Sequence, residues 1–402
     1  MKLALVTLVA ISSSRPQALF AQHAAAAAEW AAFAKSFDAD AVRDSIVGGS
    51  VILLRDGEVV ARHVYGFADR AERRMVDPNT IFHYGSITKT LTAIAIMQLR
   101  DRGRLALDDR VTSYIPELRM VHDPYGSMDS VTIRMLLSHS AGFQNPTWPY
   151  TQGKSWQPFE PTTWNQLVAM MPYQELLFKP GTRFSYSNPG FIYLARIIEQ
   201  LSGDPWENYV QKNILSPLGL SRSYFGTTPY YLAHDRSHNY TLQVDSSGRE
   251  SVRDNGSDFD PGITIPNGGW NAPLGDLAIY LAYLTDASRG DTTKQRIYAT
   301  VLRRSSLEEM WRPVHQTGPS IRGDSESMAL SFFVVRGGGA TIVGHTGEQA
   351  GFVSFMYLNP STGLAVVGVL NTISDLPDGK LPAGTGPSAF NLIRERALKL
   401  IE

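Results

Sequence analysis

The first residues whose types and spacing suggest chemistry are Ser86 and Lys89, three positions apart in the stretch HYGSITKTLTAIAIMQLRDRG. An apolar helical pattern begins directly after them, and residues three apart on a helix share one face. A serine hydroxyl is a weak nucleophile until a neighbouring base takes its proton. Lys89 can be that base if burial and the positive helix N-terminus keep its amine neutral. The simpler alternative is a capping serine and a solvated lysine, because Ser-x-x-Lys alone occurs by chance in many chains.

A second polar group, Tyr186-Ser187-Asn188, stands immediately before a predicted helix in the stretch PGTRFSYSNPGFIYLARII. A tyrosine can accept a proton as phenolate if a cation such as Lys89 lies near it. The amide of Asn188 can donate to a substrate carbonyl. The structural alternative is an N-cap, because Asn188 followed by Pro189 is a favourable helix start. Both interpretations can hold together.

The third group, His345-Thr346-Gly347, lies between two predicted strands in the stretch VGHTGEQAGFVSFMYL. Gly347 permits a close approach between the backbone and a ligand. The N–H of Glu348 would then face the substrate oxygen and, with the N–H of Ser86, would form an oxyanion hole. The alternative is a β-turn rich in small residues.

Strand signals surround these motifs. Residues 50–54 and 58–65 are apolar and β-branched on either side of Asp56-Gly57, which predicts a hairpin. Late in the chain, glycine-rich turns separate four predicted strands of an antiparallel meander, namely 329–335, 341–344, 352–358 and 365–371. An amphipathic helix is predicted over residues 388–401.

The middle of the chain has a different character. Residues 105–266 are rich in aromatics and prolines, with helices predicted at 163–171 and 191–201 and a long polar surface loop or insertion at 231–261. Strands at both ends with helices between them predict a discontinuous α/β domain, residues 29–104 and 267–402. The fold class is therefore α/β (α+β), an antiparallel sheet flanked by helices, with a mostly helical domain inserted at 105–266.

The order of the three polar motifs carries a family resemblance. Ser-x-x-Lys, then Tyr-x-Asn about a hundred residues later, then His-Thr-Gly near the C-terminus form a set related to that of β-lactamases and penicillin-binding proteins. The chain resembles the penicillin-recognising serine hydrolases, especially the class C β-lactamase branch, which includes D,D-peptidases, D-aminopeptidases and carboxylesterases. The resemblance runs from Val47 to Asn371 and includes the stretches DPNTIFHYGSITKTLTA, LLSHSAGF, PGTRFSYSNPGF, LGL and GHTGEQAGF. The fold of that family, a β-lactamase-like α/β domain split by a helical one, agrees with the predicted elements.

The resemblance implies a role for each motif residue: nucleophile for Ser86, general acid and base for Lys89 and Tyr186, and substrate binding for Asn188, His345, Thr346 and Gly347. His345 is a departure, because the β-lactamases of this branch usually have lysine there. His-Thr-Gly is more similar to the soluble D,D-peptidases and related hydrolases, whereas many of the esterases have tryptophan at that position. A histidine need not be cationic at neutral pH, which weakens the analogy with a β-lactamase.

Composition narrows the partners and cofactors. The 402-residue chain has a formal net charge of -1 and no long basic run, so neither nucleic acid nor a membrane surface is expected as a partner. It contains no cysteine, which excludes disulfides, thiolate nucleophiles and zinc–cysteine sites. The Gly-x-Ser-x-Gly elbow, His-Glu-x-x-His and the P-loop are also absent from the sequence.

The remaining polar candidates have simpler interpretations. His234 and His238 have a spacing that could bind a metal, but the sequence shows no obvious third ligand beside them. No metal site and no cofactor are therefore predicted. His139 in SHSAG is expected to be structural, and Asp276 is expected to cap a helix.

The N-terminus resembles a short secretory signal. Lys2 precedes an apolar run over residues 3–11 and then small residues, with a cleavage site expected near Ala21 or within the alanines at 24–28. The run is shorter than the roughly 20 residues that span a bilayer. Residues 1–28 are therefore predicted to be a signal peptide of a periplasmic or secreted protein. The alternative is an ordinary N-terminal helix on a cytoplasmic protein.

These observations predict a serine hydrolase that cleaves a small-molecule ester, amide or D-peptide through an acyl-enzyme on Ser86. An esterase or a hydrolase of D-amino-acid peptides fits best. Two alternatives stay open: a penicillin-binding sensor with little turnover, and a true class C-like β-lactamase. The sequence carries no indication of the natural substrate or of the oligomeric state.

Overall fold

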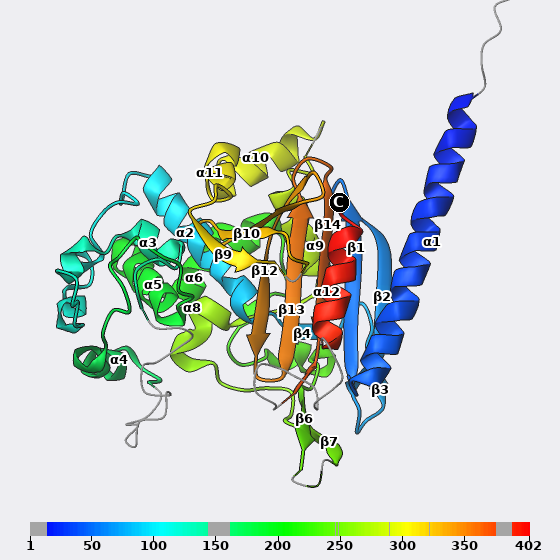
Figure 1. The fold of residues 1–402 in the computed structure, drawn as a ribbon, viewed down its shortest axis with the longest axis horizontal. Coiled ribbons are helices and arrows are strands. Elements are labelled where there is room, and N and C mark those ends of the chain that lie inside the picture. The colour runs from blue at the N-terminus through cyan, green and yellow to red at the C-terminus, as the bar shows by residue number, and fades with distance from the viewer. Residues whose placement is uncertain are drawn as a thin grey trace, which may run out of the picture.

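The computed structural model describes residues 14–143, residues 161–374 except 246, 248, 289 and 321, and residues 388–402. The largest sheet in these ranges has nine strands in the order β3-β2-β1-β14-β13-β12-β11-β10-β9, and neighbouring strands are antiparallel (Figure 1). Its strands are β1 (Gly48–Arg55), β2 (Glu58–Asp69), β3 (Arg74–Met75), β9 (His315–Pro319), β10 (Ser325–Met328), β11 (Phe333–Gly337), β12 (Ala340–Gln349), β13 (Phe352–Asn359) and β14 (Leu364–Leu370).

The two ends of the chain meet in this sheet. The predicted hairpin is confirmed as β1 and β2, and its turn residues Asp56 and Gly57 both have positive φ, at 51° and 81°. β1 also pairs with β14, so that Gly49 lies opposite Leu370. The mixed α/β architecture with an antiparallel sheet is therefore as the sequence predicted.

Helices cover both faces of the sheet. α1 (Ser14–Arg43) and α12 (Ala389–Lys399) pack on one face, and α9 (Leu274–Leu284) packs against β1 and β14 on the other. Every residue of β13 is buried, and successive side chains alternate between the two cores: Phe355 lies in the core under α1 and α12, whereas Met356 lies in the larger core. This alternation follows from the two-residue repeat of a strand.

The central region is mostly helical. α2 (Thr88–Asp101) contacts α5 and α8, and α8 in turn contacts β12 of the sheet. The other helices are α3 (Ile133–Leu137), α4 (Trp164–Met170), α5 (Asn188–Ser202), α6 (Trp206–Val210), α7 (Ser216–Leu218), α8 (Ile265–Gly268), α10 (Thr292–Val301) and α11 (Arg304–Glu309). α4 and α5 correspond to the two helices that the sequence predicted, and α5 ends at Gly203 in a left-handed conformation as expected.

Two predictions about the strands were wrong. The polar segment 231–261 was predicted as a loop or a surface insertion; it is not a plain loop, because it contains the antiparallel pair β6 (Tyr240–Val244) and β7 (Glu250–Asp254). β6 also pairs in parallel with β15 (Thr372–Ser374), a partner more than a hundred residues away that local pattern cannot reveal.

A second small sheet joins β4 (Ile81–His83), β8 (Trp270–Pro273) and β5 (Tyr224–Phe225). β9 and β10 were also not predicted, and the strand expected at 329–335 lies instead at β11.

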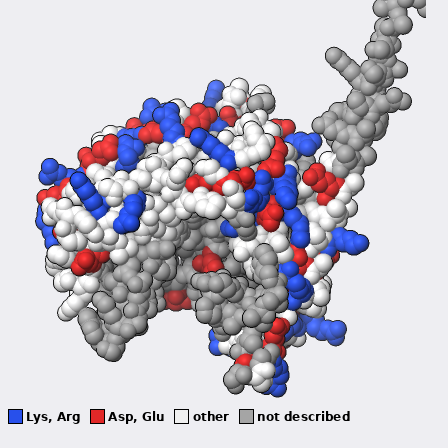
Figure 2. All heavy atoms as spheres, viewed as in Figure 1, with Lys and Arg blue, Asp and Glu red and all other residues white. Residues whose placement is uncertain are grey.

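The described part of the N-terminus is the helix α1, whose first part projects beyond the sheet in Figure 1. Residues 1–13 of the predicted signal peptide (residues 1–28) lie outside the described residues, and residues 14–28 belong to α1. Among the described residues, no helix has both the length and the apolar character needed to cross a membrane. Over the face drawn in Figure 2, the described Lys and Arg residues are interspersed with Asp and Glu.

Candidate active site

Ser86 lies at the junction between the single turn η1 (Gly85–Ile87) and α2. One turn later, the Lys89 side chain points back to it, and Lys89 Nζ donates to Ser86 Oγ at 2.8 Å. A second bond, also 2.8 Å, joins Lys89 Nζ to the carbonyl oxygen of Asn267. The structure therefore brings together the first two predicted residues, in a geometry that permits proton transfer between them.

The environment of Lys89 disfavours its charged form. The residue is 0% exposed, and burial holds its pKa well below the ordinary value for lysine. No carboxylate lies within ion-pair distance of it among the described residues. The solvated-lysine alternative is thus wrong for Lys89, and a neutral amine at this position can accept the proton of Ser86.

Tyr186 lies on the other side of the lysine. Lys89 Nζ is 4.9 Å from the centroid of the Tyr186 ring. Burial raises the pKa of the Tyr186 hydroxyl, and the neighbouring Ser86 lowers it by a smaller amount. The hydroxyl is buried, and no described residue forms a hydrogen bond of normal geometry with it. It can therefore exchange a proton with a bound substrate or with Ser86.

His139 holds the tyrosine in place, which the sequence did not reveal beyond a structural role. The rings of His139 and Tyr186 are stacked with their centroids 4.2 Å apart. The backbone N–H of Ser187 donates to His139 Nδ1 at 2.9 Å, and burial holds the pKa of His139 well below its usual range. His139 is therefore a neutral ring that fixes both the plane of Tyr186 and the start of α5.

Asn188 is the first residue of α5, but it is not the N-cap that the sequence suggested. The cap is Ser187, whose hydroxyl accepts from the N–H of Gly190 at 3.2 Å. Asn188 Oδ1 is buried and has no hydrogen-bond partner among the described residues. Because Ser187 caps the helix, the Asn188 side chain is available to a substrate amide.

His345 forms the wall opposite Tyr186, and the ring centroids of the two residues lie 6.2 Å apart. His345 is 1% exposed, and burial lowers its pKa to about 3. Its Nδ1–H donates to the Thr346 carbonyl, while Nε2 is buried without a partner among the described residues. At neutral pH this histidine is uncharged and presents a hydrogen-bond acceptor.

Two glycines allow β12 to meet the nucleophile turn. A Cβ atom on Gly347 would lie 1.9 Å from the carbonyl oxygen of Tyr84, and one on Gly85, whose φ is +50°, would lie 2.7 Å from the backbone nitrogen of Glu348. The backbones of η1 and β12 therefore touch only because both positions lack a side chain.

The same contact brings the backbone nitrogen of Glu348 against the turn that carries Ser86. β11 pairs with β12 only over residues 340–344, so the edge of β12 beyond Gly344 has no partner strand in the described ranges on that side. This free edge places the predicted oxyanion donor, the N–H of Glu348, beside the turn that carries Ser86. Donors positioned in this way can stabilise the negative oxygen of a tetrahedral intermediate.

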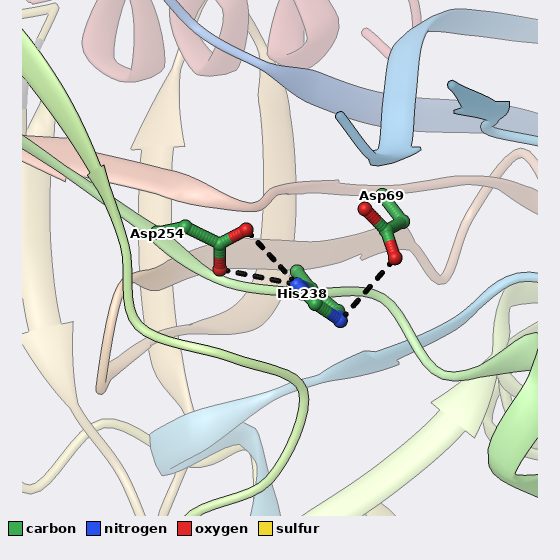
Figure 3. A group of neighbouring side chains, drawn as sticks. All are labelled: Asp69, His238 and Asp254. Carbon is green, nitrogen blue, oxygen red and sulfur yellow. Dashed lines mark hydrogen bonds and ion pairs between the residues drawn. The ribbon is translucent and has the colours of Figure 1, made fainter. Parts of the chain in front are cut away.

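A separate cluster of possible metal ligands lies near the β6–β7 hairpin (Figure 3). Asp69, His238 and Asp254 offer ligand atoms within 4.8 Å of one another, whereas His234 is not among them. The sequence had suggested no third ligand. However, the two ring nitrogens of His238 face different carboxylates, Nε2 at 3.4 Å from Asp69 and Nδ1 at 3.1 Å from Asp254. One ion cannot use both nitrogens, so this cluster is better explained as a clamp between β2 and β7.

The prediction that Asp276 caps a helix was wrong, because its carboxylate binds a different segment. It lies in the first turn of α9, but its carboxylate accepts from the backbone N–H of Arg222 at 3.0 Å and from the hydroxyl of Ser223 at 2.9 Å. It therefore anchors the segment before β5 and does not cap its own helix.

Comparison with known proteins agrees with the fold. The β-lactamase family model matches residues 20–383. The chain belongs to the β-lactamase family. This is the family of penicillin-recognising serine hydrolases that its motifs resemble.

Individual known proteins are similar to this one along most of its chain. The protein flp of Staphylococcus aureus strain COL is 25% identical over 337 residues, which cover 84% of this chain and 62% of flp. The chain thus spans less than two thirds of that relative. An octameric penicillin-binding protein homologue from Pyrococcus abyssi superposes with a TM-score of 0.70 and 29% identity, covering 90% of this chain and 75% of the other. A D-stereospecific amidohydrolase from Streptomyces sp. gives 0.65 and 26%, covering 86% and 94%.

Proposed function

We propose that this protein is a serine hydrolase that cleaves an ester or amide bond through an acyl-enzyme on Ser86. The observation that carries the proposal is the 2.8 Å bond between Ser86 Oγ and a fully buried lysine whose pKa is lowered. A structural lysine in this position would normally have an anionic partner. An amine kept neutral beside a hydroxyl is instead the arrangement that activates a nucleophile.

The reaction follows from the positions of the groups. Ser86 Oγ attacks the substrate carbonyl carbon, and its proton passes to Lys89 Nζ. The carbonyl oxygen becomes negative between the N–H groups of Ser86 and Glu348. The Tyr186 hydroxyl donates a proton to the leaving oxygen or nitrogen and is reprotonated from Lys89, which leaves an ester on Ser86. Water then repeats these transfers in reverse, releasing the acid and restoring the serine hydroxyl.

Small esters and amides of D-amino acids or D-peptides are the substrate class that we favour. The similarity to a D-stereospecific amidohydrolase over 86% of this chain supports that choice. Asn188 supports it as well, because its unpartnered buried oxygen can accept an amide N–H of the substrate. The role of His345 is to provide a neutral acceptor on the opposite wall.

A β-lactam is the second candidate substrate, supported by the same nucleophile and oxyanion geometry. We expect penicillin to acylate Ser86 and to be released slowly. The strained amide needs only Lys89 and the oxyanion hole for acylation, whereas deacylation also needs a positioned water. At the wall position, the buried His345 is neutral where the β-lactamases of the class C branch usually carry lysine.

One panel of assays tests these proposals. Purified protein is incubated with a chromogenic ester, a D-amino-acid p-nitroanilide and penicillin, with Ser86→Ala as the matched control. We expect turnover of the ester or anilide, and a penicillin adduct on the Ser86 peptide in intact-mass spectrometry, both absent in Ser86→Ala. Rapid multiple turnover of penicillin would make the protein a β-lactamase. No turnover and no adduct with any of the three compounds would refute the hydrolase function.

Export is a separate proposal and depends on the N-terminal pattern alone. We expect expression of the full chain in a bacterial host to yield a shortened protein in the periplasm or medium. Sequencing of its N-terminus should begin between residues 22 and 29, as the predicted cleavage region requires. An intact N-terminus on protein confined to the cytoplasm would contradict export.

A further inference from the structure

A cavity of about 270 Å³ lies beside the oxyanion strand. Side chains on β12 alternate, so Thr346 and Glu348 line this cavity, whereas His345 and Gly347 face the nucleophile turn. The rest of the lining comes from the connection between α1 and β1, from β13, β14, β15 and β6, and from the start of α12. Its apolar members are Ile46, Leu242, Val353, Leu370, Ile373 and Phe390. The volume is slightly below the range of about 300–1,000 Å³ for small-molecule sites, which suits one amino-acid-sized group.

Three charged side chains line the cavity, and two of them have partners. Asp44 accepts from the N–H of Ala389 and is paired with Arg43. The guanidinium of Arg394 donates to Asn391 Oδ1 at 3.4 Å and lies 5.4 Å from the centroid of the Phe390 ring. Asp44 is therefore neutralised by Arg43, whereas Arg394 has no carboxylate partner among the described residues and its Nε is buried without a hydrogen bond.

Arg394 lines the same cavity as Glu348, and its side chain contacts a strand position several residues from Glu348. The Tyr357 side chain contacts Arg394, and Tyr357 pairs with Gly344 across β12 and β13. Gly344 is four residues before Glu348, which corresponds to about 13 Å along a strand. Arg394 forms no ion pair with Glu348 in the described ranges of the chain.

Glu348 is thus the anionic group in this cavity without a partner. Its side chain makes no hydrogen bond or ion pair with any residue that the structure describes, and partial burial raises its pKa with no cation to oppose the shift. The residue as a whole is exposed, so a ligand can reach the carboxylate. Its own backbone N–H is the proposed oxyanion donor, which fixes the carboxylate close to the reacting carbonyl.

We propose that the Glu348 carboxylate selects substrates that carry a free ammonium group next to the scissile carbonyl, as amides and esters of unblocked amino acids do. This inference rests on the proposed hydrolase function and names its substrate class. When Glu348 N–H holds the carbonyl oxygen, the α-ammonium is only one carbon from the carbonyl carbon, within reach of the same residue's side chain. A charge-assisted hydrogen bond then supplies the partner that the carboxylate lacks. An N-acylated or deaminated substrate leaves it unpaired.

A pair of anilides tests the inference, because they differ only in the ammonium group. D-phenylalanine p-nitroanilide and 3-phenylpropionic acid p-nitroanilide are compared by kcat/KM in the wild type, in Glu348→Gln and in Glu58→Gln. Glu58 is an exposed carboxylate on β2 and provides the matched control. The measured quantity is the ratio of the two kcat/KM values, which cancels any general effect of Glu348→Gln on the oxyanion hole or on folding yield.

We expect the wild type to prefer the ammonium compound and Glu348→Gln to reduce this ratio by about 10-fold or more, as loss of a hydrogen bond between charged groups predicts. Glu58→Gln should keep the wild-type ratio. A ratio in Glu348→Gln within threefold of the wild type, or a wild type that prefers the uncharged compound, would overturn the inference while leaving the hydrolase function in place. Failure of the wild type to cleave any ester or anilide would instead refute the proposed function.

Discussion

Replacing Lys89 with methionine should affect catalysis and stability in different ways, because the amine is buried and has no countercharge among the residues that the structure describes. The substitution keeps the length and apolar stem of the side chain but removes the base. General acid–base catalysis contributes about 10²–10⁴-fold, so we expect kcat/KM for a simple ester to fall by that factor. The fall should come mainly from kcat, since Lys89 contacts Ser86 Oγ and not the predicted substrate-binding residues.

The effect on stability follows from the difference between the pKa of Lys89 in the folded and unfolded states. The unfolded chain protonates this lysine near pH 10.4, whereas the folded protein does so only at a lower pH, because burial depresses the pKa. Between the two values the unfolded state binds one more proton. The free energy of unfolding of the wild type therefore rises with pH by about 1.4 kcal/mol per unit from this group. Lys89→Met lacks this contribution, although it leaves the Asn267 carbonyl without its hydrogen bond.

The assay compares urea unfolding of the wild type and Lys89→Met between pH 8 and 10, together with their ester hydrolysis corrected for the spontaneous rate. Other titrating groups are common to both proteins, so they cancel in the difference between the two free energies. That difference should shift in favour of the wild type as pH rises. A constant difference across this range would mean that Lys89 is charged in the folded protein, and near-normal activity in a folded variant would equally refute its role as the base.

Three further outcomes are expected. Tyr186→Phe should lower kcat by about 10²-fold or more, and its loss should not add to that of Lys89→Met in a double-mutant cycle, because the groups act as a unit. Gly347→Ala should cost about 10²–10³-fold in kcat, since its Cβ would lie 1.9 Å from the Tyr84 carbonyl and displace the oxyanion donor; an unaffected kcat would contradict that geometry. His345, with a pKa of about 3, should remain neutral in NMR titrations above pH 5. The stability that its neutral form contributes should decline as pH falls from about 6.5 towards 3. A titration midpoint near 6.5 would show that the ring is exposed.

Local signals in the sequence were sufficient for several elements. The turn pair Asp56-Gly57 predicted the β1–β2 hairpin because few residues adopt positive φ without strain. The glycine after Ser202 predicted the end of α5 for the same reason. The segment 240–254 was misread because its strands are stabilised by β15 from a distant part of the chain, and their polar residues resemble a loop when that partner is unknown.

The types and order of the motif residues were determined by the sequence alone: a hydroxyl and an amine one helical turn apart, a tyrosine before a helix, and glycines where backbones must approach. Tertiary structure decided their chemical states, because pKa values depend on burial and on neighbours that no local pattern shows. Only the fold reveals that Lys89 is fully buried with no anion beside it in the described ranges, that His139 stacks on Tyr186, and that His345 is neutral. It also decides that Glu348 faces a cavity with its carboxylate unpartnered, since the two-residue alternation of β12 acquires meaning only when the sides of the sheet are known.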